Sequence, residues 1–387
     1  MLKRLFGARA AAPDSAEACF RLGSELAQSG QLDQAIKLLQ RATELAPHGA
    51  GAFHNLGSAY RDRGDAPAAL DAYRKAAQLD PSFADAHYGV GLMLMGERRY
   101  EEALASLLRA IKLNPRLAEA RFQAGNARMG LGDWQGALAE LKAAIDARPD
   151  YAEARWARAM SQLPAVYGFG TDPAERRRAF AAQLDALCQW FAATRRPDAY
   201  LAVGVHQPFY LAYQETSNRE LLAQYGALCA GLMGAWQSQA GLAPPAPRQA
   251  GKTRGKIRGK PRIGIVSAHV HDHSVWTALV RGWVERLAAA NHLHIFHLGA
   301  TQDAETGLAR RRAARFDAGP RPFDAWARAI HGAQLDLVLY PEIGMDATTA
   351  KLASLRLAPV QAASWGHPET SGLPTIDYYL SAQALEP

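Results

Sequence analysis

The sequence contains little cysteine and no long hydrophobic run. No apolar stretch approaches the roughly 18 residues that a transmembrane helix needs, and the N-terminus MLKRLFGARAAAPDS lacks the hydrophobic segment of a signal peptide. The 3 cysteines (Cys19, Cys188 and Cys229) are odd in number and lie far apart, which excludes the disulfide framework of a small secreted domain. We therefore expect a cytoplasmic protein with free thiols and no membrane partner.

The sequence has fewer acidic than basic residues: 37 Asp and Glu and 44 Lys and Arg, which give a net charge of +7. Most of the excess lies in one segment, GKTRGKIRGKPR (251–262). A basic stripe can bind nucleic acid or anionic lipid, but this one has no interleaved aromatic residues and follows the proline-rich GLAPPAPRQA. The pattern favours a solvated interdomain linker, so we expect no nucleic-acid partner.

A period of 34 residues runs through the N-terminal part of the chain. Four series keep this spacing: Pro47, Pro81, Pro115 and Pro149; Gly23, Gly57, Gly91 and Gly125; Ala35, Ala69, Ala103 and Ala137; Ala42, Ala76, Ala110 and Ala144. Small residues allow two helices to cross closely, and the larger Leu39, Tyr73, Leu107 and Leu141 fill the neighbouring gap. A proline opens each following repeat, where its missing N–H costs little. The period predicts pairs of antiparallel helices.

The period and pattern resemble the tetratricopeptide repeat, in four copies over about residues 15–149 with a partial fifth beginning at YAEARWARAM. Such arrays usually bind extended peptides or partner proteins in a concave groove. We therefore expect a protein or peptide partner, with a purely structural spacer as the alternative. Nothing in the repeats looks catalytic.

The C-terminal half changes to alternating strands and helices. Residues 173–240 are typical of amphipathic helices, and the candidate strands are 263–268, 293–299, 335–341, 360–365 and 378–382, with helices such as 274–290 and 348–357 between them. Short β-rich runs separated by helices indicate a parallel sheet with helices on both faces. Ligands of such folds lie beyond the carboxyl ends of the strands.

These patterns predict an α superhelix of tetratricopeptide repeats followed by an α/β Rossmann-like lobe. A chain of 387 residues is long enough for two or three domains. We expect a flexible N-terminus (1–14), the repeats (15–160), a helical connecting region (161–243), a basic Pro/Gly linker (244–261) and the Rossmann-like lobe (262–387).

Three histidines alternate after the first candidate strand, in SAHVHDHSVW (267–276). The metallo-β-lactamase fold follows a strand with H-x-H-x-D-H, but the spacing here is one residue short and no second ligand set is evident. A metal site is thus a minor alternative, and solvent-exposed loop residues are another reading of His269 and His271. His273 stands at a predicted helix N-terminus, where Ser274 or Asp272 could cap.

A second loop, SWGHPETSGLP (364–374), follows another candidate strand and is rich in small and hydroxyl residues. Backbone N–H groups and hydroxyls at such a strand end can donate to phosphate oxygens. An ordinary tight loop is the alternative.

The repeats, the linker, VSAHVHDHSVW and RLAPVQAASWGHPETSGLPTIDYYLS together resemble the O-linked N-acetylglucosamine transferase family, particularly its Spindly-like bacterial members. The last of these segments is the most specific, with the pattern R-x-A-P-x-Q, then T-S-G, then D-Y. The resemblance implies a two-lobed, inverting glycosyltransferase without a metal or other cofactor. It would move a sugar from a UDP-linked donor to a Ser or Thr hydroxyl of a protein.

The resemblance also assigns site residues. The family's histidine after the first strand matches His273, near the acceptor and the donor phosphates. The donor loop of the family matches Gly366, Pro368, Thr370 and Ser371, with His367 among them. Without a metal, the charge on the leaving diphosphate must be met by N–H groups, hydroxyls and helix N-termini, and a histidine can relay the acceptor proton.

Two features depart from the family. The chain ends at Pro387, where the family continues into a second nucleotide-binding lobe, so we expect a fragment or a half-enzyme that binds the acceptor. The segment YPEIGMD (340–346) replaces an Asn-Gly-type turn, which leaves the donor and acceptor preferences open. The alternative function is a tetratricopeptide adaptor with a catalytically incomplete lobe. The sugar, the acceptor and the oligomeric state are left open by the sequence.

Overall fold

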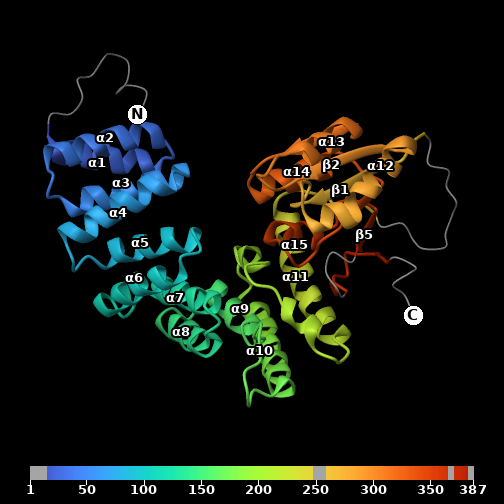
Figure 1. Cartoon of the computed structure of the whole chain (residues 1–387), viewed down its shortest axis with the longest axis horizontal. Helices are drawn as coiled ribbons and strands as arrows, with labels where there is room; N and C mark the ends of the chain where they lie inside the picture. The colour runs from blue at the N-terminus through green and yellow to red at the C-terminus, as the bar shows by residue number, and fades with distance from the viewer. Residues whose placement is uncertain (1–14, 247–258, 365–369, 382–387) are drawn as a thin grey trace. The chain divides into compact units, whose positions relative to one another are not determined.

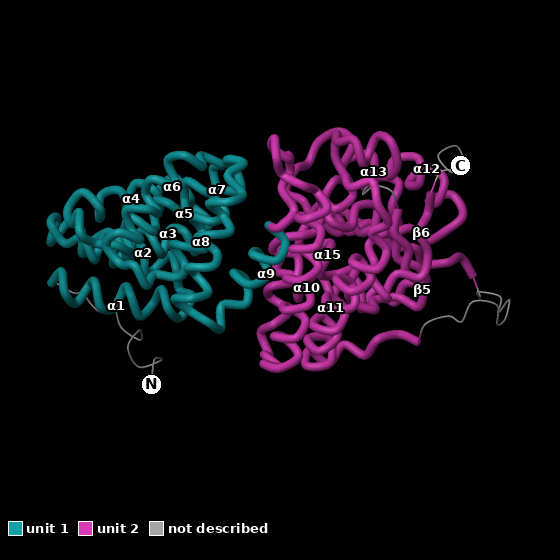
Figure 2. Tube along the Cα trace, turned by 90° about the horizontal axis from the view of Figure 1, so that it is seen from below, with its two compact units in different colours: residues 1–161 teal, residues 162–387 magenta. Residues whose placement is uncertain are grey.

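The computed structural model describes residues 15–246, 259–364 and 370–381 and forms two compact units, Met1–Ser161 and Gln162–Pro387 (Figures 1 and 2). The predicted fold class is confirmed: tetratricopeptide-like helix pairs are followed by a lobe built on a parallel sheet. The expected flexible N-terminus and residues 247–258 of the expected linker lie outside the described residues. Among the helices of the described part, none combines the length and hydrophobicity that a membrane span requires.

The first unit is a row of consecutive antiparallel helix pairs. Its helices are α1 (Ala16–Gln28), α2 (Leu32–Leu45), α3 (Ala50–Arg63), α4 (Ala66–Leu79), α5 (Ala84–Gly96), α6 (Tyr100–Leu113), α7 (Ala118–Gly130), α8 (Trp134–Ala147) and α9 (Ala152–Met160). Each helix packs mainly on the helices before and after it along the chain. This is the nearest-neighbour packing that defines a repeat array.

The glycine series lies at the crossing of the two helices in each repeat, as the spacing predicts. A Cβ atom would come within 2.9 Å of Leu39 at Gly23, 2.9 Å of Tyr73 at Gly57, 2.6 Å of Leu107 at Gly91 and 2.9 Å of Leu141 at Gly125. The four larger partners are buried. Each repeat therefore packs one bulky side chain into the space that one glycine leaves.

The prolines do not begin helices, which corrects the expectation that they open the following repeat. They lie in the turns, two residues past the last residue of α2, α4, α6 and α8. The residues before them, Ala46, Asp80, Asn114 and Arg148, have φ between −131° and −138° and ψ between 76° and 94°. Proline disfavours the helical conformation of the preceding residue, so these prolines end the second helix of each repeat.

The second unit begins with helical segments and continues into the sheet. The helical segments are α10 (Pro173–Thr194), η2 (Ala199–Ala202), η3 (Phe209–Tyr213) and α11 (Arg219–Gln239). The strands are β1 (Arg262–Ser267), β2 (His292–His297), β3 (Arg315–Ala318), β4 (Leu337–Tyr340), β5 (Val360–Ser364) and β6 (Tyr378–Leu380). Between them lie η4 (Trp276–Val280), α12 (Arg281–Ala290), α13 (Ala304–Arg312), α14 (Phe323–Gly332) and α15 (Ala347–Ala353).

All paired strands are parallel, in the order β3-β2-β1-β4-β5-β6. Five of these strands lie within one residue of the candidate strands, or inside them. Strand β3 was not predicted, because RFDA is short and none of its residues is fully buried. It therefore has no apolar run that a sequence pattern could detect.

Helices cover both faces of the sheet. On one face, Ile265 and Ile295 pack with Val284 of α12 in the main core of the lobe. On the other face, the ring of Phe296 meets the ring of Trp326 in α14 edge-on, with 6.4 Å between the centroids. Consecutive residues of a strand point to opposite faces, and Ile295 and Phe296 are both fully buried. The central strands are therefore buried on both sides, as parallel sheets require.

Candidate functional site

The strand order creates one favoured place for a ligand. From β1 the chain moves outward to β2 and β3, and it then returns to β4 on the other side of β1. Open α/β sheets bind ligands outside the carboxyl ends of the strands at this point of reversal. The loop after β1 carries the three histidines, and the loop after β4 carries Glu342 and Asp346. Both loops thus leave the sheet at the switch point.

His273 forms the N-terminal cap of the helical segment at 274–290. Its Nδ1 accepts a hydrogen bond from the Val275 backbone N–H at 3.2 Å, and its carbonyl oxygen accepts one from the Thr277 N–H at 2.9 Å. The expectation that Ser274 or Asp272 caps is therefore wrong. Because Nδ1 is an acceptor here, the proton of the neutral ring is on Nε2, and Nε2–H is the group that can donate to a ligand.

The histidine rings gather at this edge of the sheet. His269 and His273 are stacked, with 4.0 Å between centroids and 13° between planes, and His271 lies 5.8 Å and 5.6 Å from them. The ring of His297, at the end of β2, lies 6.1 Å from His271. Desolvation, followed by the neighbouring His273 and His271, lowers the pKa of His269 to about 4. His269 is therefore neutral at pH 7.

The described residues include no group of three or more His, Cys, Asp or Glu side chains arranged to hold a metal ion. The stack explains why His269 and His273 do not converge on one point. Two parallel rings in contact present their nitrogens side by side, whereas tetrahedral ligation needs nitrogens that point to a common centre.

Glu342, in the loop after β4, contacts the first residue of the loop that carries the three histidines. Its side chain is 0% exposed, and its Oε1 accepts a hydrogen bond from the Ala268 N–H at 2.8 Å. The next residue of the loop, His269, donates its N–H to the Ser267 hydroxyl at 3.0 Å. Desolvation raises the pKa of Glu342 to about 8. The acid is therefore mostly protonated at neutral pH.

The loop after β5 is described from Thr370 onward, and the predicted Gly366, His367 and Pro368 lie outside the described residues. The Thr370 hydroxyl accepts from the Gly372 N–H at 3.3 Å, and the Ser371 hydroxyl accepts from the Leu373 N–H at 3.4 Å. Both hydroxyls thus support their own turn. Among the described residues they form no hydrogen bond with His273, so the structure joins the two predicted parts of the site only through the common edge of the sheet.

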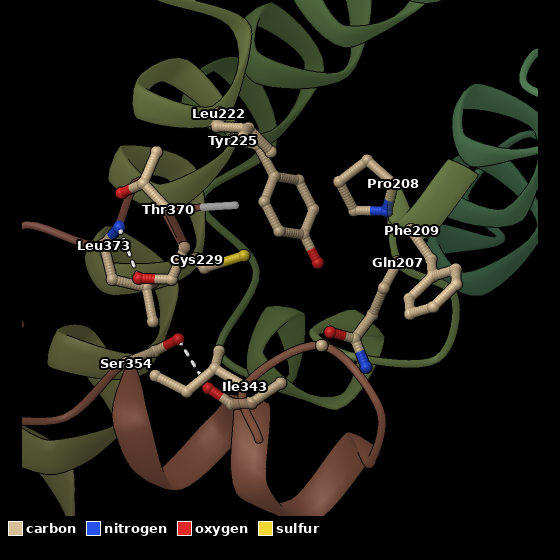
Figure 3. A pocket seen from close by; sticks show the side chains of 13 residues that line it. Gln207, Pro208, Phe209, Leu222, Tyr225, Cys229, Ile343, Ser354, Thr370 and Leu373 are labelled. Carbon is tan, nitrogen blue, oxygen red and sulfur yellow. Dashed lines mark hydrogen bonds between the residues drawn. The ribbon is translucent and has the colours of Figure 1, made fainter. Parts of the chain in front are cut away.

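Thr370 and Ser371 also line a small cavity of about 30 Å³ (Figure 3). Most of its remaining lining is apolar and comes from α11, from residues 207–209 and from the segment 343–354. Cys229 points into this cavity from α11. Burial raises the pKa of the Cys229 thiol to about 12, so it stays protonated at neutral pH and is a poor nucleophile.

The residues that carry the family pattern R-x-A-P-x-Q and D-Y hold the shape of this loop. Arg356 donates to the Asp377 carboxylate at 2.6 Å, and the same carboxylate accepts from the Gln361 N–H at 2.8 Å. The Gln361 side chain, 0% exposed, donates to the carbonyls of Leu355 and Thr375 at 2.8 and 2.9 Å. These residues therefore brace the two ends of the loop.

Helix α11 fixes the loop by direct backbone contact. Gly372 has φ of +66°, which favours glycine, and a Cβ there would overlap the Leu222 carbonyl group. A Cβ at Gly226 would overlap the Gly372 carbonyl group. The side chain of Gln237 adds two hydrogen bonds to the backbone of Arg356, at 3.0 and 3.3 Å. The helices before the linker are therefore part of the framework that positions the site.

Sequence reasoning missed the contributions of Glu342 and His297. Glu342 is separated from Ala268 by 74 residues, and only the pairing of β1 with β4 brings them together. A detectable signal is the acidic residue directly after the apolar run LVLYP, since parallel strands end at the same edge as their neighbours. His297 is the last residue of β2, and its ring lies beside His271.

The comparisons with known proteins agree with this architecture. Residues 23–61 and 57–96 match a family model described as TPR repeat, and residues 91–162 match one described as tetratricopeptide repeat. A sequence search of curated proteins found no match.

Among solved structures, the chain is similar to a mutant of the O-GlcNAc transferase of Thermobaculum terrenum. The TM-score is 0.56 at 19% identity over 87% of this chain and 54% of that chain. It is also similar to YrrB, a TPR protein with an unusual peptide-binding site, with a TM-score of 0.40 and 25% identity over 49% of this chain and 90% of that one. MamA from Desulfovibrio magneticus RS-1 matches with a TM-score of 0.42 and 17% identity over 48% and 100%.

The chain thus spans about half the length of the transferase that it matches. At this level of identity the likeness concerns the fold. The chain thus contains tetratricopeptide repeats, and its fold is similar to that of a bacterial O-GlcNAc transferase.

Proposed function

We propose that this chain provides the repeat array and the first lobe of a protein O-glycosyltransferase. The enzyme moves a sugar from a UDP-linked donor to a Ser or Thr hydroxyl of a protein that the repeats bind. The observation that carries the proposal is the position of His273, which caps a helix at the carboxyl end of β1, where the switch point of the sheet lies. The fold similarity to a bacterial O-GlcNAc transferase supports it.

The proposed role of His273 follows from its hydrogen bond. Glycosyl transfer builds negative charge on the leaving diphosphate, and catalysis requires donors aimed at that charge. With Nδ1 occupied by the Val275 N–H, His273 offers Nε2–H as a donor. The positive end of the helix that it caps acts in the same direction. We therefore assign His273 to the phosphate side of the reaction and not to removal of the acceptor proton.

Donor binding in this proposal involves the loop after β5. The Thr370 and Ser371 hydroxyls accept from their own turn, which leaves their O–H groups able to donate to phosphate or sugar oxygens. Gly366, His367 and Pro368 belong to the same proposed loop. The proposal includes no metal or other cofactor, because N–H and O–H donors meet the charge that a cation would otherwise neutralise.

The test is sugar transfer from labelled UDP-GlcNAc and UDP-glucose to a library of Ser- and Thr-containing peptides. His273→Ala removes the cap and the ligand donor together. His273→Asn keeps a cap acceptor, because asparagine is a good N-cap residue. We expect about 100-fold lower kcat in His273→Ala and an intermediate value in His273→Asn. Turnover equal to wild type in both variants would remove His273 from the mechanism, and loss of transfer in excess chelator would contradict a metal-free reaction.

An adaptor is the second candidate function. It is favoured by the tetratricopeptide repeats at 23–162, since such arrays usually bind peptides or partner proteins. In that case the full chain binds peptides from the library, while neither labelled donor transfers a sugar and neither UDP-sugar binds in calorimetry.

A further inference from the structure

We propose that Glu342 is a positioning residue that holds the histidine loop (268–273) in place only while its carboxyl group is protonated. The structural part of this inference stands on the geometry of the lobe alone. Its consequence for catalysis rests on the proposed transferase function, since His273 is on the loop that Glu342 supports.

Glu342 has too few hydrogen-bond donors around it to stabilise a buried carboxylate ion. The side chain is 0% exposed, and Oε1 accepts the Ala268 N–H at 2.8 Å. The other carboxyl oxygen, Oε2, is buried without a hydrogen-bond partner among the described residues. A protonated acid keeps this acceptor contact and has one O–H to place, for which the Ser267 hydroxyl is the neighbouring polar group. A carboxylate instead needs several donors or a cation.

The charged groups around Glu342 do not compensate a negative charge. From β1, it faces the Ser267 hydroxyl and the Ala268 backbone, neither of which is charged. From its own loop, it faces Asp346, an acid of the same sign. His269, on the histidine loop, is also influenced by the charge of Asp346, but burial keeps this ring neutral at pH 7. Within the part of the chain that the structure describes, ionised Glu342 would therefore be a buried anion without a cationic partner.

The loop is the part of the structure that can relieve such a charge. It begins at Ala268, which Glu342 binds directly, and both of its outer histidines depend on the backbone path that follows. Moving Ala268 away would admit water to the carboxylate. The same movement would separate the stacked rings of His269 and His273. Deprotonation of Glu342 and loss of the loop conformation are thus one event.

Three substitutions separate this role from a merely structural one. Glu342→Gln replaces the acid by a neutral side chain of the same shape, which keeps an acceptor for Ala268 at every pH. Asp346→Asn removes the neighbouring charge but keeps the cap that Asp346 gives to the Thr349 N–H at 2.7 Å. Glu285→Gln on α12 is the control, because Glu285 is an exposed acid that pairs with Arg281.

The experiment is hydrogen exchange measured by mass spectrometry on the full chain between pH 6 and pH 9.5, for peptides covering residues 262–275. In wild type and in Glu285→Gln, protection of the loop falls by about tenfold per pH unit up to the raised pKa of Glu342, about 8, and then levels off, because below this pH the closed loop binds a proton that the opened loop has released. Glu342→Gln keeps its protection. In Asp346→Asn the closed-state pKa of Glu342 is lower, so the fall levels off at a lower pH and less protection is lost. Equal pH dependence in wild type and Glu342→Gln would overturn the inference, and so would levelling-off at the same pH in wild type and Asp346→Asn.

Sugar transfer measured over the same pH range distinguishes this inference from the proposed function. If the loop exchange follows the expected pattern and no variant transfers sugar at any pH, the inference stands and the proposed function fails. If sugar is transferred with the same alkaline limb in wild type and Glu342→Gln, the proposed function stands and the inference fails. Should Glu342→Gln not fold, the comparison of wild type with Asp346→Asn decides alone, through the pH at which the loss of protection levels off.

Discussion

At the scale of single residues, the site is built from groups kept neutral by their surroundings. His269 is neutral because burial and the neighbouring imidazoles of His273 and His271 oppose a positive charge, and Glu342 is mostly protonated at neutral pH because burial disfavours its charged form. In the proposed transferase this would favour a diphosphate, since fixed dipoles stabilise the developing charge without a competing local ion. Under that proposal, N–H groups such as those at the N-terminus capped by His273 would meet the charge of the donor.

The first prediction concerns how stability depends on pH. The pKa of Glu342 is raised from 4.5 to about 8 in the folded chain, so between these values the native state binds a proton that the unfolded state has released. The free energy of unfolding therefore falls as pH rises through this window. Relative to Glu342→Gln, we expect wild type to lose up to about 4 kcal/mol between pH 5 and pH 8.

Urea denaturation of both chains at several pH values measures this difference. The control is Glu285→Gln, which keeps the pH dependence of wild type because the removed acid is exposed. A constant difference between wild type and Glu342→Gln across pH 5–8 would show that Glu342 is already ionised in the folded chain.

Sequence reasoning reached the location of these residues but not their roles. The strand at 262–267 and the helical segment at 274–290 were predictable from their apolar patterns, so the loop between them was too. The cap formed by His273 was not, because several neighbouring residues could cap equally well. The Thr370 and Ser371 hydroxyls were expected to face a donor, and the hydrogen bonds found are those to their own backbone.

At the scale of elements, glycines decide how closely helices approach their neighbours. In the repeats, a large side chain of the next helix packs against each glycine of the series. In α11, the backbone of the loop after β5 packs against Gly226. The 34-residue period made the first arrangement predictable. The second arrangement could not be predicted in this way, because the contact between Gly226 and Gly372 is not repeated at a fixed spacing and joins residues far apart along the chain.

The second prediction compares two glycines of α11. Gly226→Ala places a methyl group against the Gly372 carbonyl group, whereas Gly231→Ala places one in open space. We expect Gly226→Ala to destabilise the chain by about 1–3 kcal/mol through overpacking. We expect Gly231→Ala to stabilise it by about 0.5–1 kcal/mol, because alanine is the better helix residue.

Thermal unfolding of the two variants beside wild type gives the sign of each effect. Both variants replace a glycine of α11 by alanine, so the effect of helix propensity on stability is the same in each. The difference between their unfolding temperatures then reports the contact of Gly226 with the loop. Shifts of the same sign in both variants would mean that α11 and the loop are not in close contact.

At the scale of the whole molecule, the second compact unit starts well before its sheet. It extends from Gln162 to Pro387, whereas the sequence pattern changes at Arg262, where β1 begins. The alternation of strands and helices is visible in a sequence, but the packing of α11 on the lobe depends on single contacts. One example is the Gln237 side chain, which binds the backbone of Arg356, 119 residues away.

The third prediction follows from this boundary. A chain of residues 162–387 is expected to unfold in one cooperative transition, because it keeps the contacts of α11 with the loop and with Arg356. A chain of residues 262–387 exposes the surfaces that α11 covers, and we expect it to aggregate or to unfold without a sharp transition. Circular dichroism during heating measures both, and equal cooperativity of the two chains would contradict the expectation.

The contact between Gly226 and Gly372 also bears on how this lobe can change during evolution. A side chain at either position meets backbone, so no compensating substitution at the other position makes room for it. The two glycines are thus expected to be inherited together, and single replacements to be eliminated. Descendants that lose one of them must reroute the loop after β5, and the surface that this loop offers to a ligand would be rebuilt at the same step.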